Sequence, residues 1–414
     1  MKRRERSLFG AQFGEKFAEV CAWVNLSVIG RMISRHNRFW IPGRGQNGLF
    51  RIDHPTFGYA VRQQVYVFEH QFVMLRKIPQ LWRREARFGM FMHCGVYSIP
   101  GRGEWIQWAK QIPTDQYAQL ADQFHPEHFD ADAWASIAKA GGMKYMVLTA
   151  RHHDGFALFD DPGSSFTAMK SAAHHDFVAD YVKAVRKAGL GVGLYYSPLD
   201  WRLPGFFFPG IYQPSAIELR EQYQRQIDEL ASHYGKLDIL WFDGGGDEWL
   251  GFGGVEFTGS GWQARPKGKP CSGSFDWEDR KTVAHLRQLQ PGIIVNDRTN
   301  APADFRSREG DAALGDFDNQ HPWELCTTIT EGAWGYQANA KVKPLAHLLE
   351  LLVGAAGRDG NMLLNVGPRP DGKIDPAQEA RLREIGQWLS PYGEGICGTR
   401  GWSLASWNLW RLNT

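Results

Sequence analysis

The sequence lacks the features that mark several large classes of protein. Its 414 residues include 47 Lys and Arg against 45 Asp and Glu, so the formal net charge is only +2. A nearly neutral chain has no overall field to attract nucleic acid or an anionic membrane, and we expect neither as a partner. No apolar run reaches membrane-spanning length, and charged residues at 15–19 interrupt the stretch where a signal peptide would need an apolar segment. We therefore expect a cytoplasmic protein.

Motifs for metals and cofactors are also missing. The five cysteines are widely scattered, with no CxxC pair and no zinc-type Cys/His spacing, which disfavours a disulfide framework. No HExxH sequence places two histidines on one helix face, and no GxGxxG turn follows the first predicted strand. We expect no metal and no cofactor.

Aromatic residues, by contrast, are plentiful. The chain is 43% hydrophobic and 13% aromatic, with 17 tryptophans. This composition is ample for a buried core in one large α/β barrel or in two smaller domains. Trp faces also suit sugar rings, because axial C–H groups pack on the π surface while the hydroxyls stay free to hydrogen-bond.

Two parts of the chain differ in regularity. Residues 1–80, with an amphipathic stretch near 13–32, are predicted to be an N-terminal extension of unknown role, and residues 81–414 to be a barrel. In the second part, short apolar runs alternate with helical patterns, which is typical of βα units. The predicted strands are residues 88–92, 145–149, 192–196, 238–242, 293–295, 327–329 and 362–366. The predicted helices are residues 131–140, 176–187, 216–234, 277–289, 343–355 and 376–389.

The alternation predicts an α/β fold, a distorted (β/α)8 TIM-like barrel. Polar or glycine-rich residues follow every predicted strand except the sixth, and in a parallel barrel those strand ends share one face. A doubly wound open sheet is the alternative. The barrel is favoured because site-like residues end many strands instead of gathering at one switch point.

The run from Asp238 to Gly246 is the strongest site signal. Its apolar residues end at Asp243, and three glycines follow, which predicts a buried strand that delivers a carboxylate to a rim beside a close-lying backbone. The alternative is a strand-end Asp that caps the next helix.

Histidines and carboxylates supply further candidates. His152 and His153 are adjacent at a strand end, where two side chains rarely ligate one metal, although a metal-dependent hydrolase using them is an alternative. Hydrolysis of a sugar needs two carboxyl groups, one to attack or activate water and one to protonate the leaving oxygen. Asp243 is the natural first. From spacing alone the second is open among Glu104, Glu248, Glu309, Glu324 and Glu331.

Six motifs together resemble a known family. They are residues 87–98 (RFGMFMHCGVYS), 148–156 (LTARHHDGF), 195–197 (YYS), 241–244 (WFDG), 296–298 (NDR) and 363–368 (LLNVGP). Their order and spacing, from about Trp82 to Gly401, resemble the retaining α-L-fucosidases of glycoside hydrolase family 29.

The resemblance implies an exo-acting enzyme that removes terminal α-L-fucose from glycans or small fucosides with retention and without a metal. It implies that Asp243 is the nucleophile and that Glu309 is the acid/base, with Glu324 as second choice. Residues that match positions around the fucose are His93, Glu104, Trp105, His152, His153, Tyr196 and Arg298. Trp241 and Trp334 are predicted to form an apolar wall for the C6 methyl group.

The chain departs from the family pattern in two places. Cys94 stands where the family usually has Trp, and the usual C-terminal β-sandwich is expected to be absent. A catalytically inactive carbohydrate-binding protein on the same fold is an alternative, since a fold alone does not establish activity.

Overall fold

The computed structural model describes residues 39–42, 49–52, 85–207, 209–210, 212–244, 255–258, 261–264 and 275–401. The chain divides into two compact units, Met1–Leu75 and Arg76–Thr414. In the first unit the described residues form an antiparallel pair, β1 Phe39–Pro42 and β2 Leu49–Ile52. The amphipathic stretch at 13–32 lies outside the described residues. The role of residues 1–80 and the cytoplasmic location stay predictions.

Eight parallel strands form the centre of the second unit. In chain order they are β3 Phe88–Met92, β4 Tyr145–Arg151, β5 Gly191–Tyr196, β6 Ile239–Phe242, β9 Ile294–Val295, β10 Arg306–Glu309, β11 Trp323–Thr328 and β12 Asn361–Val366. Their order in the sheet is β10-β11-β12-β3-β4-β5-β6-β9. A short antiparallel pair, β7 Val255–Thr258 and β8 Gly261–Ala264, lies between β6 and β9 in sequence.

The two outer strands of this sheet, β9 and β10, also meet. Asn296, directly after β9, forms a parallel bridge with Phe305, directly before β10. The Asp304 backbone N–H donates to the Val295 carbonyl over 2.9 Å, and its side-chain Oδ2 accepts from the Val295 N–H. The sheet therefore curls into the predicted distorted barrel, and β9 and β10 are joined by a loop instead of a helix.

Strand β10 was absent from the sequence-based prediction. Its residues, Arg306 to Glu309, are all polar or charged and none of them is buried, so no apolar run marks them. The sixth predicted strand, residues 327–329, was placed too late. Strand β11 begins at Trp323. Its start was missed because Glu324 interrupts the apolar pattern, although this side chain is buried inside the barrel.

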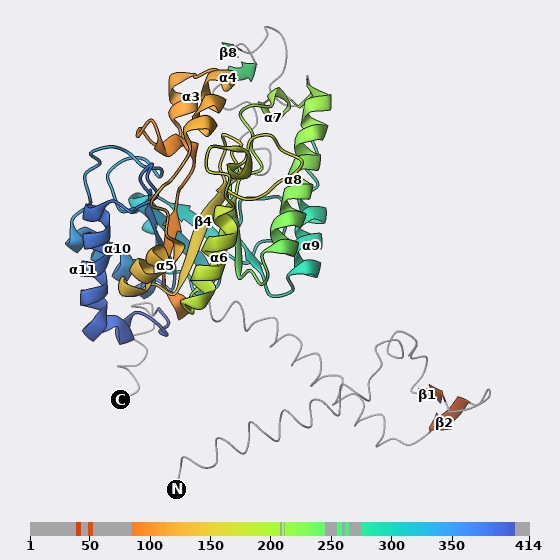
Figure 1. Cartoon of the computed structure of the whole chain (residues 1–414). Helices are drawn as coiled ribbons and strands as arrows, with labels where there is room; N and C mark the ends of the chain where they lie inside the picture. Colours follow the sequence, from red (N-terminus) through yellow and green to blue (C-terminus); the bar gives the residue numbers. More distant parts are fainter. Residues whose placement is uncertain are drawn as a thin grey trace. The chain divides into compact units, whose positions relative to one another are not determined.

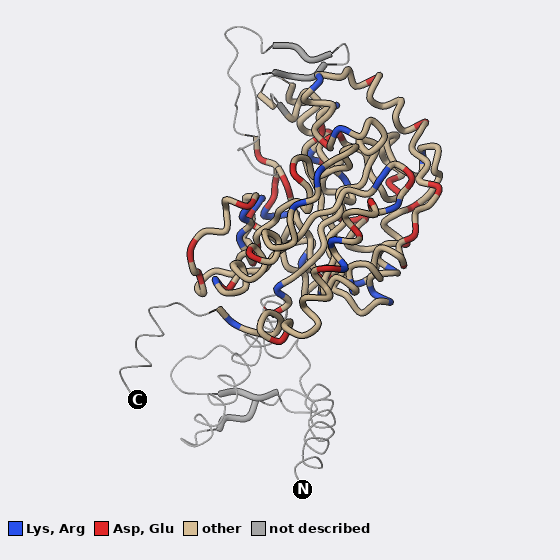
Figure 2. Tube along the Cα trace, turned by 90° about the vertical axis from the view of Figure 1, so that its left-hand side faces the viewer, with Lys and Arg blue, Asp and Glu red and all other residues tan. Residues whose placement is uncertain are grey.

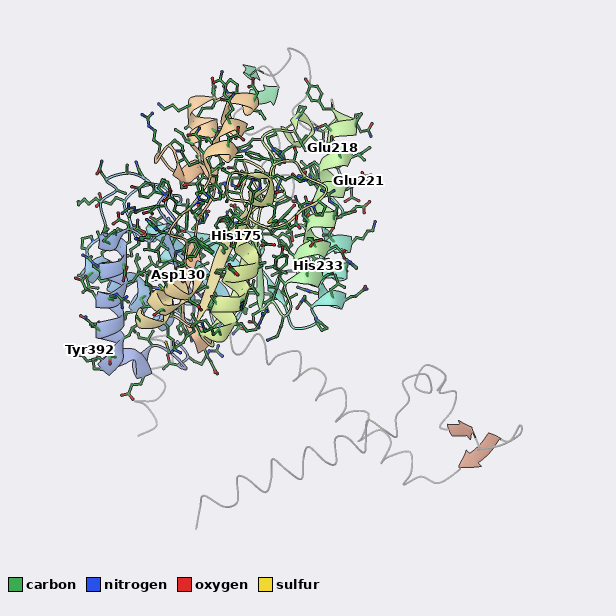
Figure 3. The ribbon with its side chains drawn as sticks, viewed as in Figure 1. Asp130, His175, Glu218, Glu221, His233 and Tyr392 are labelled. Carbon is green, nitrogen blue, oxygen red and sulfur yellow. The ribbon has the colours of Figure 1, made fainter. Side chains whose placement is uncertain are left out.

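Helices surround the strands (Figure 1). They are α3 Ile106–Lys110, α4 Thr114–Ala118, α5 Ala131–Ala140, α6 Phe177–Lys187, α7 Pro204–Phe207, α8 Gln213–His233, α9 Asp279–Leu289, α10 Leu345–Gly357 and α11 Pro376–Tyr392. Every predicted helix of residues 131–389 is present within a few residues. On α8 the buried side chains recur at helical spacing, while Glu218, Glu221 and His233 are exposed on its outer side (Figure 3).

Apolar side chains form two concentric layers. One lies between strands and helices and includes Met90, Leu148 and Leu240. The other fills the barrel and includes Phe91, Tyr145, Val147, Tyr195, Ile239, Trp241, Ile294, Cys326 and Leu363. Since successive strand residues face opposite sides, every strand of the sheet except the polar β10 contributes to both layers, and the inner layer is the floor on which a site at the strand ends can rest.

Charges of both signs are interspersed along the described part of this unit (Figure 2). None of the helices described there combines the length and apolarity that a bilayer crossing requires. Residues 402–414 lie outside the described range, so the expected absence of a C-terminal β-sandwich stays a prediction.

Packing between α5 and α11 gives a test of the fold. A Cβ on Gly386 in α11 would lie 1.8 Å from the carbonyl oxygen of Ala140 at the end of α5. Because backbone must move, Gly386→Ala should lower the free energy of unfolding by about 1–3 kcal/mol. Gly357→Ala, where no atom lies within 4 Å, is the matched control and should gain up to ~1 kcal/mol. Denaturant unfolding measures both, and equal stability of the two variants would contradict this packing.

Candidate active site

A cavity opens at the carboxyl ends of the barrel strands. Most of its lining residues come from strands or from the loops that directly follow them, as the barrel prediction requires. The lining residues are Phe91, His93, Trp105, His152, His153, Tyr195, Trp241, Asp243, Arg298, Glu309, Cys326 and Trp334. Nine of the eleven predicted site residues are thus brought together, and the other two, Glu104 and Tyr196, are not part of the lining.

Asp243 follows β6 directly and points into the cavity. Its Oδ2 accepts a hydrogen bond from the Tyr195 hydroxyl at 2.9 Å, and its Oδ1 accepts from Arg298 Nη1 at 2.8 Å. The next residue, Gly244, has φ +81°, and a Cβ there would lie 1.7 Å from Leu199. Asp243 is therefore held by two donors and by a turn that needs glycine.

Arg298 joins Asp243 to a second carboxylate. Its Nη2 donates to Glu309 Oε2 at 2.6 Å, while Nη1 donates to Asp243. Its Nε donates to the Ser307 hydroxyl, which in turn donates to Asp297 Oδ1 at 2.6 Å. Burial disfavours the guanidinium charge, but Asp243 and Glu309 outweigh this and raise the pKa of Arg298. A fixed cation thus lies between the two candidate catalytic carboxyl groups.

His93 has a defined tautomer. Asn365 donates its Nδ2 to the Trp334 carbonyl at 2.7 Å, so its Oδ1, 2.6 Å from His93 Nδ1, is an acceptor. His93 therefore carries its proton on Nδ1 and leaves Nε2 as a hydrogen-bond acceptor. Burial lowers the pKa of His93 to about 3, which keeps the ring neutral at ordinary pH.

His152 and His153 are neutral as well. Burial and the cations Arg151 and Arg298 lower the pKa of His153 to about 3, and burial and the neighbouring histidines lower that of His152 well below its ordinary value. His153 Nδ1 lies 2.7 Å from the Ser197 hydroxyl, and its Nε2 lies 3.5 Å from Asp243 Oδ2. Within the described residues, no three His, Cys, Asp or Glu side chains are arranged to hold a metal ion.

Aromatic rings form the walls. Tyr195 and Trp241 stack at a centroid distance of 5.8 Å, and the Arg298 guanidinium lies 5.2 Å from the centre of the Trp241 ring. Trp334 lies 5.3 Å from His93. Trp105 contacts His153 at 5.4 Å. The cavity thus combines flat apolar faces with a small number of fixed polar atoms.

Tyr195, and not Tyr196, faces the cavity. Tyr195 pairs with Trp241 across β5 and β6, and paired residues of parallel strands face the same side. Tyr196 points outward, where its hydroxyl donates to Gln226 of α8 at 2.8 Å. The prediction that Tyr196 contacts the ligand is corrected accordingly.

Glu104 and Glu324 are buried and hydrogen-bond to residues beside or beneath the cavity. Glu104 Oε2 accepts from the Gly335 backbone N–H at 2.6 Å, next to Trp334. Burial raises the pKa of Glu104, while backbone hydrogen bonds oppose the shift. Glu324 lies inside the barrel, where it accepts hydrogen bonds from Tyr145 and from Trp241 Nε1. Neither residue lines the cavity, so the second-choice acid Glu324 lies beneath the site instead of at its opening.

A family model described as alpha-L-fucosidase matches residues 57–394. The chain belongs to the α-L-fucosidase family. It is 31% identical to tissue alpha-L-fucosidase of Mus musculus over 361 residues, which cover 80% of this chain and 74% of that protein. The chain is therefore a glycoside hydrolase, as the motifs predicted.

Solved structures of α-L-fucosidases share the fold. Alpha-L-fucosidase isoenzyme 1 from Paenibacillus thiaminolyticus matches with a TM-score of 0.68 and 32% identity, covering 80% of this chain and 79% of that one. An α-L-fucosidase from Bacteroides thetaiotaomicron, trapped as a covalent intermediate with 2-fluoro-fucosyl fluoride, matches with a TM-score of 0.64 and 28% identity. That match covers 77% of this chain and 75% of that one.

Besides Tyr195, which faces the cavity where Tyr196 was predicted, the structure adds two lining residues that sequence reasoning missed. Phe91 and Cys326 belong to apolar runs and carry no sign of a site, but they share the inward side of their strands with Trp241. Phe91 could have been predicted from the alternation of strand side chains, because residues two apart face the same side and His93 was already a candidate. Cys94, where the family usually has Trp, packs in the outer layer and is not among the lining residues.

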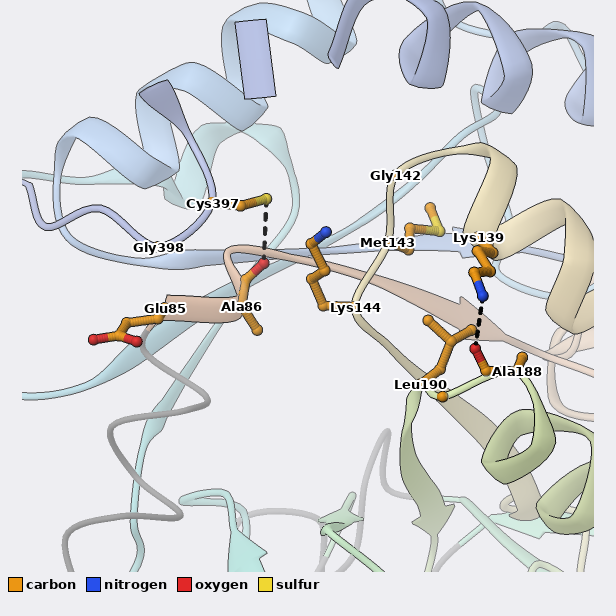
Figure 4. Close-up of a pocket in the computed structure, with 11 residues that line it drawn as sticks. Glu85, Ala86, Lys139, Gly142, Met143, Lys144, Ala188, Leu190, Cys397 and Gly398 are labelled. Carbon is orange, nitrogen blue, oxygen red and sulfur yellow. Dashed lines mark hydrogen bonds between the residues drawn. The ribbon is translucent and has the colours of Figure 1, made fainter. Parts of the chain in front are cut away.

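A second cavity lies at the opposite ends of the strands (Figure 4). Its lining includes Ala86, Lys144 and Leu190, which precede β3, β4 and β5, together with Cys397 near the end of the described chain. Among the described residues, Glu85 is the one carboxyl residue in its lining, so this cavity lacks the pair of carboxyl groups that hydrolysis of a sugar needs.

The buried Asp154, next to His153, gives a test of pH dependence. Burial raises its pKa from 3.8 to about 6, against hydrogen bonds from Phe156 N and Tyr117. A raised folded-state pKa stabilises the protein at low pH, and this contribution is lost as pH rises from about 4 through about 6. Asp154→Asn should therefore gain stability relative to wild type across that window, by up to roughly 3 kcal/mol.

Denaturant unfolding between pH 4 and 7.5 measures this difference. Asp200→Asn is the control, because Asp200 is also buried but its pKa is shifted the other way. Its burial is outweighed by Arg202 and Arg151, which lower the pKa. The ionised Asp200 stabilises the folded protein above pH 3.8. The loss of free energy of unfolding in Asp200→Asn should therefore be constant from about pH 5 to 7.5. A pH-independent difference for Asp154→Asn would contradict the predicted proton uptake on folding.

Proposed function

We propose that this protein is an exo-acting retaining α-L-fucosidase, with Asp243 as nucleophile and Glu309 as acid/base. The observation that carries the proposal is that Asp243 and Glu309 both line the cavity and are bridged by one guanidinium, that of Arg298. Terminal α-L-fucose of a glycan or a small fucoside is the proposed substrate.

In the first step, the Asp243 carboxylate attacks the anomeric carbon as the bond to the leaving oxygen breaks. Glu309 gives its proton to that oxygen, so the aglycone departs as an alcohol. The Tyr195 and Arg298 donors keep Asp243 oriented for attack. A fucosyl ester of Asp243 remains.

In the second step, Glu309 is the carboxylate that takes a proton from water while the water oxygen attacks the anomeric carbon. The ester bond breaks, and Asp243 regains its negative charge. The net charge of the two carboxyl groups is −1 before and after each step. Arg298 can therefore neutralise that single charge throughout the cycle, first mainly on Asp243 and then on Glu309.

The cavity chemistry suits a 6-deoxy sugar. Neutral histidines both accept and donate hydrogen bonds to hydroxyl groups, and His152 Nδ1 is buried without a partner in the free protein. The Trp faces supply apolar surface for the methyl group.

Retention requires closely spaced carboxyl groups, roughly 5–5.5 Å apart, whereas inversion needs about 6.5–9.5 Å. One guanidinium that donates to both Asp243 and Glu309 is consistent with the shorter spacing. The covalent intermediate trapped in the Bacteroides thetaiotaomicron α-L-fucosidase also supports double displacement. Hydrolysis of an aryl α-L-fucoside, followed by NMR of the first-formed anomer, tests activity and retention together. Absence of turnover would favour a carbohydrate-binding protein.

Replacement of the nucleophile gives the first kinetic test. Asp243→Ala should lower turnover by several orders of magnitude, because the covalent route is lost. Azide should restore part of the rate by attacking the vacated face and should yield a fucosyl azide of inverted configuration. Stopped assays with an activated aryl fucoside measure both effects. Near wild-type activity without azide would rule out Asp243.

Replacement of the acid/base gives the second. Glu309→Ala should hydrolyse fucosides with a basic leaving oxygen about 100-fold or more slowly, because that oxygen needs a proton to depart. The rate on activated aryl fucosides should fall much less. The basic limb of the pH–rate profile should also disappear. Equal losses on both substrates with the basic limb intact would mean that Glu309 is not the proton donor.

A further inference from the structure

We propose that Asp311 is a positioning residue that fixes Glu309 through the single residue between them, Gly310. The inference rests on the proposed function, because it assigns Asp311 to the support of the proton donor. Asp311 does not line the cavity and has no direct contact with the nucleophile.

Asp311 is tied to two neighbouring elements. Its Oδ1 accepts hydrogen bonds from the Thr327 hydroxyl of β11 and from Lys343 Nζ, the latter at 2.8 Å. Its Oδ2 lies 2.7 Å from His347 Nε2 on α10. Lys343 Nζ also donates to Thr327 at 3.1 Å, which closes the cluster. The start of the 3-10 helix η7 Asp311–Leu314 is thus attached to both β11 and α10.

The cluster is an ionic one. Burial works against a charge on Asp311, but the hydrogen bonds from His347, Lys343 and Thr327 outweigh it and lower its pKa to about 2. Asp311 is therefore a carboxylate at any working pH. Charge-assisted hydrogen bonds of this kind are stronger and more directional than neutral ones.

Glu309 needs such support more than Asp243 does. It is the last residue of β10, a short strand of polar residues. Its contacts with β9 include the bridge between Asn296 and Phe305 and the hydrogen bonds between Asp304 and Val295. Its side chain is 45% exposed, against 14% for Asp243. The ladder to β11 ends with the Glu309–Cys326 pair and the hydrogen bond from Gly310 N–H to the Cys326 carbonyl.

Between them lies Gly310, with φ +83° and open space around the position of a Cβ. Glycine restrains the backbone less than any other residue, so it cannot by itself fix the direction of Glu309. The Asp311 cluster supplies the restraint on the far side of this flexible residue. A proton donor that moves by about 1 Å can lose on the order of 100-fold in rate, so this restraint bears on catalysis.

The test is the dependence of rate on the leaving group. Asp311→Ala and Asp311→Asn should lower kcat/KM by about 10-fold or more on a fucoside with a basic leaving oxygen, and by less than about 3-fold on an activated aryl fucoside. A merely structural role would reduce the fraction of active enzyme and would lower both rates equally. Thr327→Val, which removes one donor and keeps the side-chain shape, is a milder second variant if the Asp311 variants do not fold.

Asp359→Asn is the matched control. Asp359 is a buried carboxylate whose pKa, like that of the partly exposed Asp311, is lowered to about 2, because Arg400, Arg87 and Gly401 outweigh its burial. It lies before β12, at the other end of the strands. This variant should lose stability without any change in leaving-group dependence.

A double-mutant cycle isolates the link to Glu309. If Asp311 acts through Glu309, adding Asp311→Ala to Glu309→Ala should cost almost nothing further on the demanding substrate. Additive losses, or equal losses on the two substrates in Asp311→Ala and Thr327→Val, would overturn the inference and leave the proposed function intact. If Glu309→Ala itself shows no leaving-group dependence, the acid assignment fails, and the role of Asp311 fails with it.

Discussion

The guanidinium of Arg298 bridges Asp243 and Glu309, and the arrangement of the candidate site depends on this contact. In the proposed cycle one negative charge is shared by the two carboxyl groups, and a fixed cation between them stabilises that charge on either one. The bridge holds Asp243, which directly follows β6, against Glu309, which is the last residue of the short strand β10.

The inner layer of the barrel supports Arg298 from below. Trp241 lies under the guanidinium, Tyr195 stacks on Trp241, and both are packed among apolar side chains inside the barrel. Glu324 accepts the indole N–H of Trp241, so the carboxylate beneath the site also helps to fix the ring that carries Arg298. Such layered support is what keeps a catalytic group within a few tenths of an ångström of its working position.

Much of this arrangement could be predicted from the sequence because apolar periodicity is a strong local signal. Strand β3 and helix α5 were predicted with the bounds that the structure has, and the polar residues after the strands gave most of the cavity. Strand β10 could not be found this way, since its four residues carry no apolar pattern. The choice between Tyr195 and Tyr196 depends on register, which a single strand does not reveal. Glu104 and Glu324 resemble catalytic carboxylates in sequence, and only their buried hydrogen-bond partners distinguish them.

The central claim is that Asp243 forms a covalent bond to the sugar, and labelling with 2-fluoro-fucosyl fluoride tests it most directly. The fluorine slows hydrolysis of the ester, so the intermediate should accumulate on the inactivated enzyme. Peptide mapping by mass spectrometry should then find one fluorofucosyl group on Asp243. A label on Glu309, Glu324 or any other residue, or turnover of the enzyme with no label at all, would contradict the account.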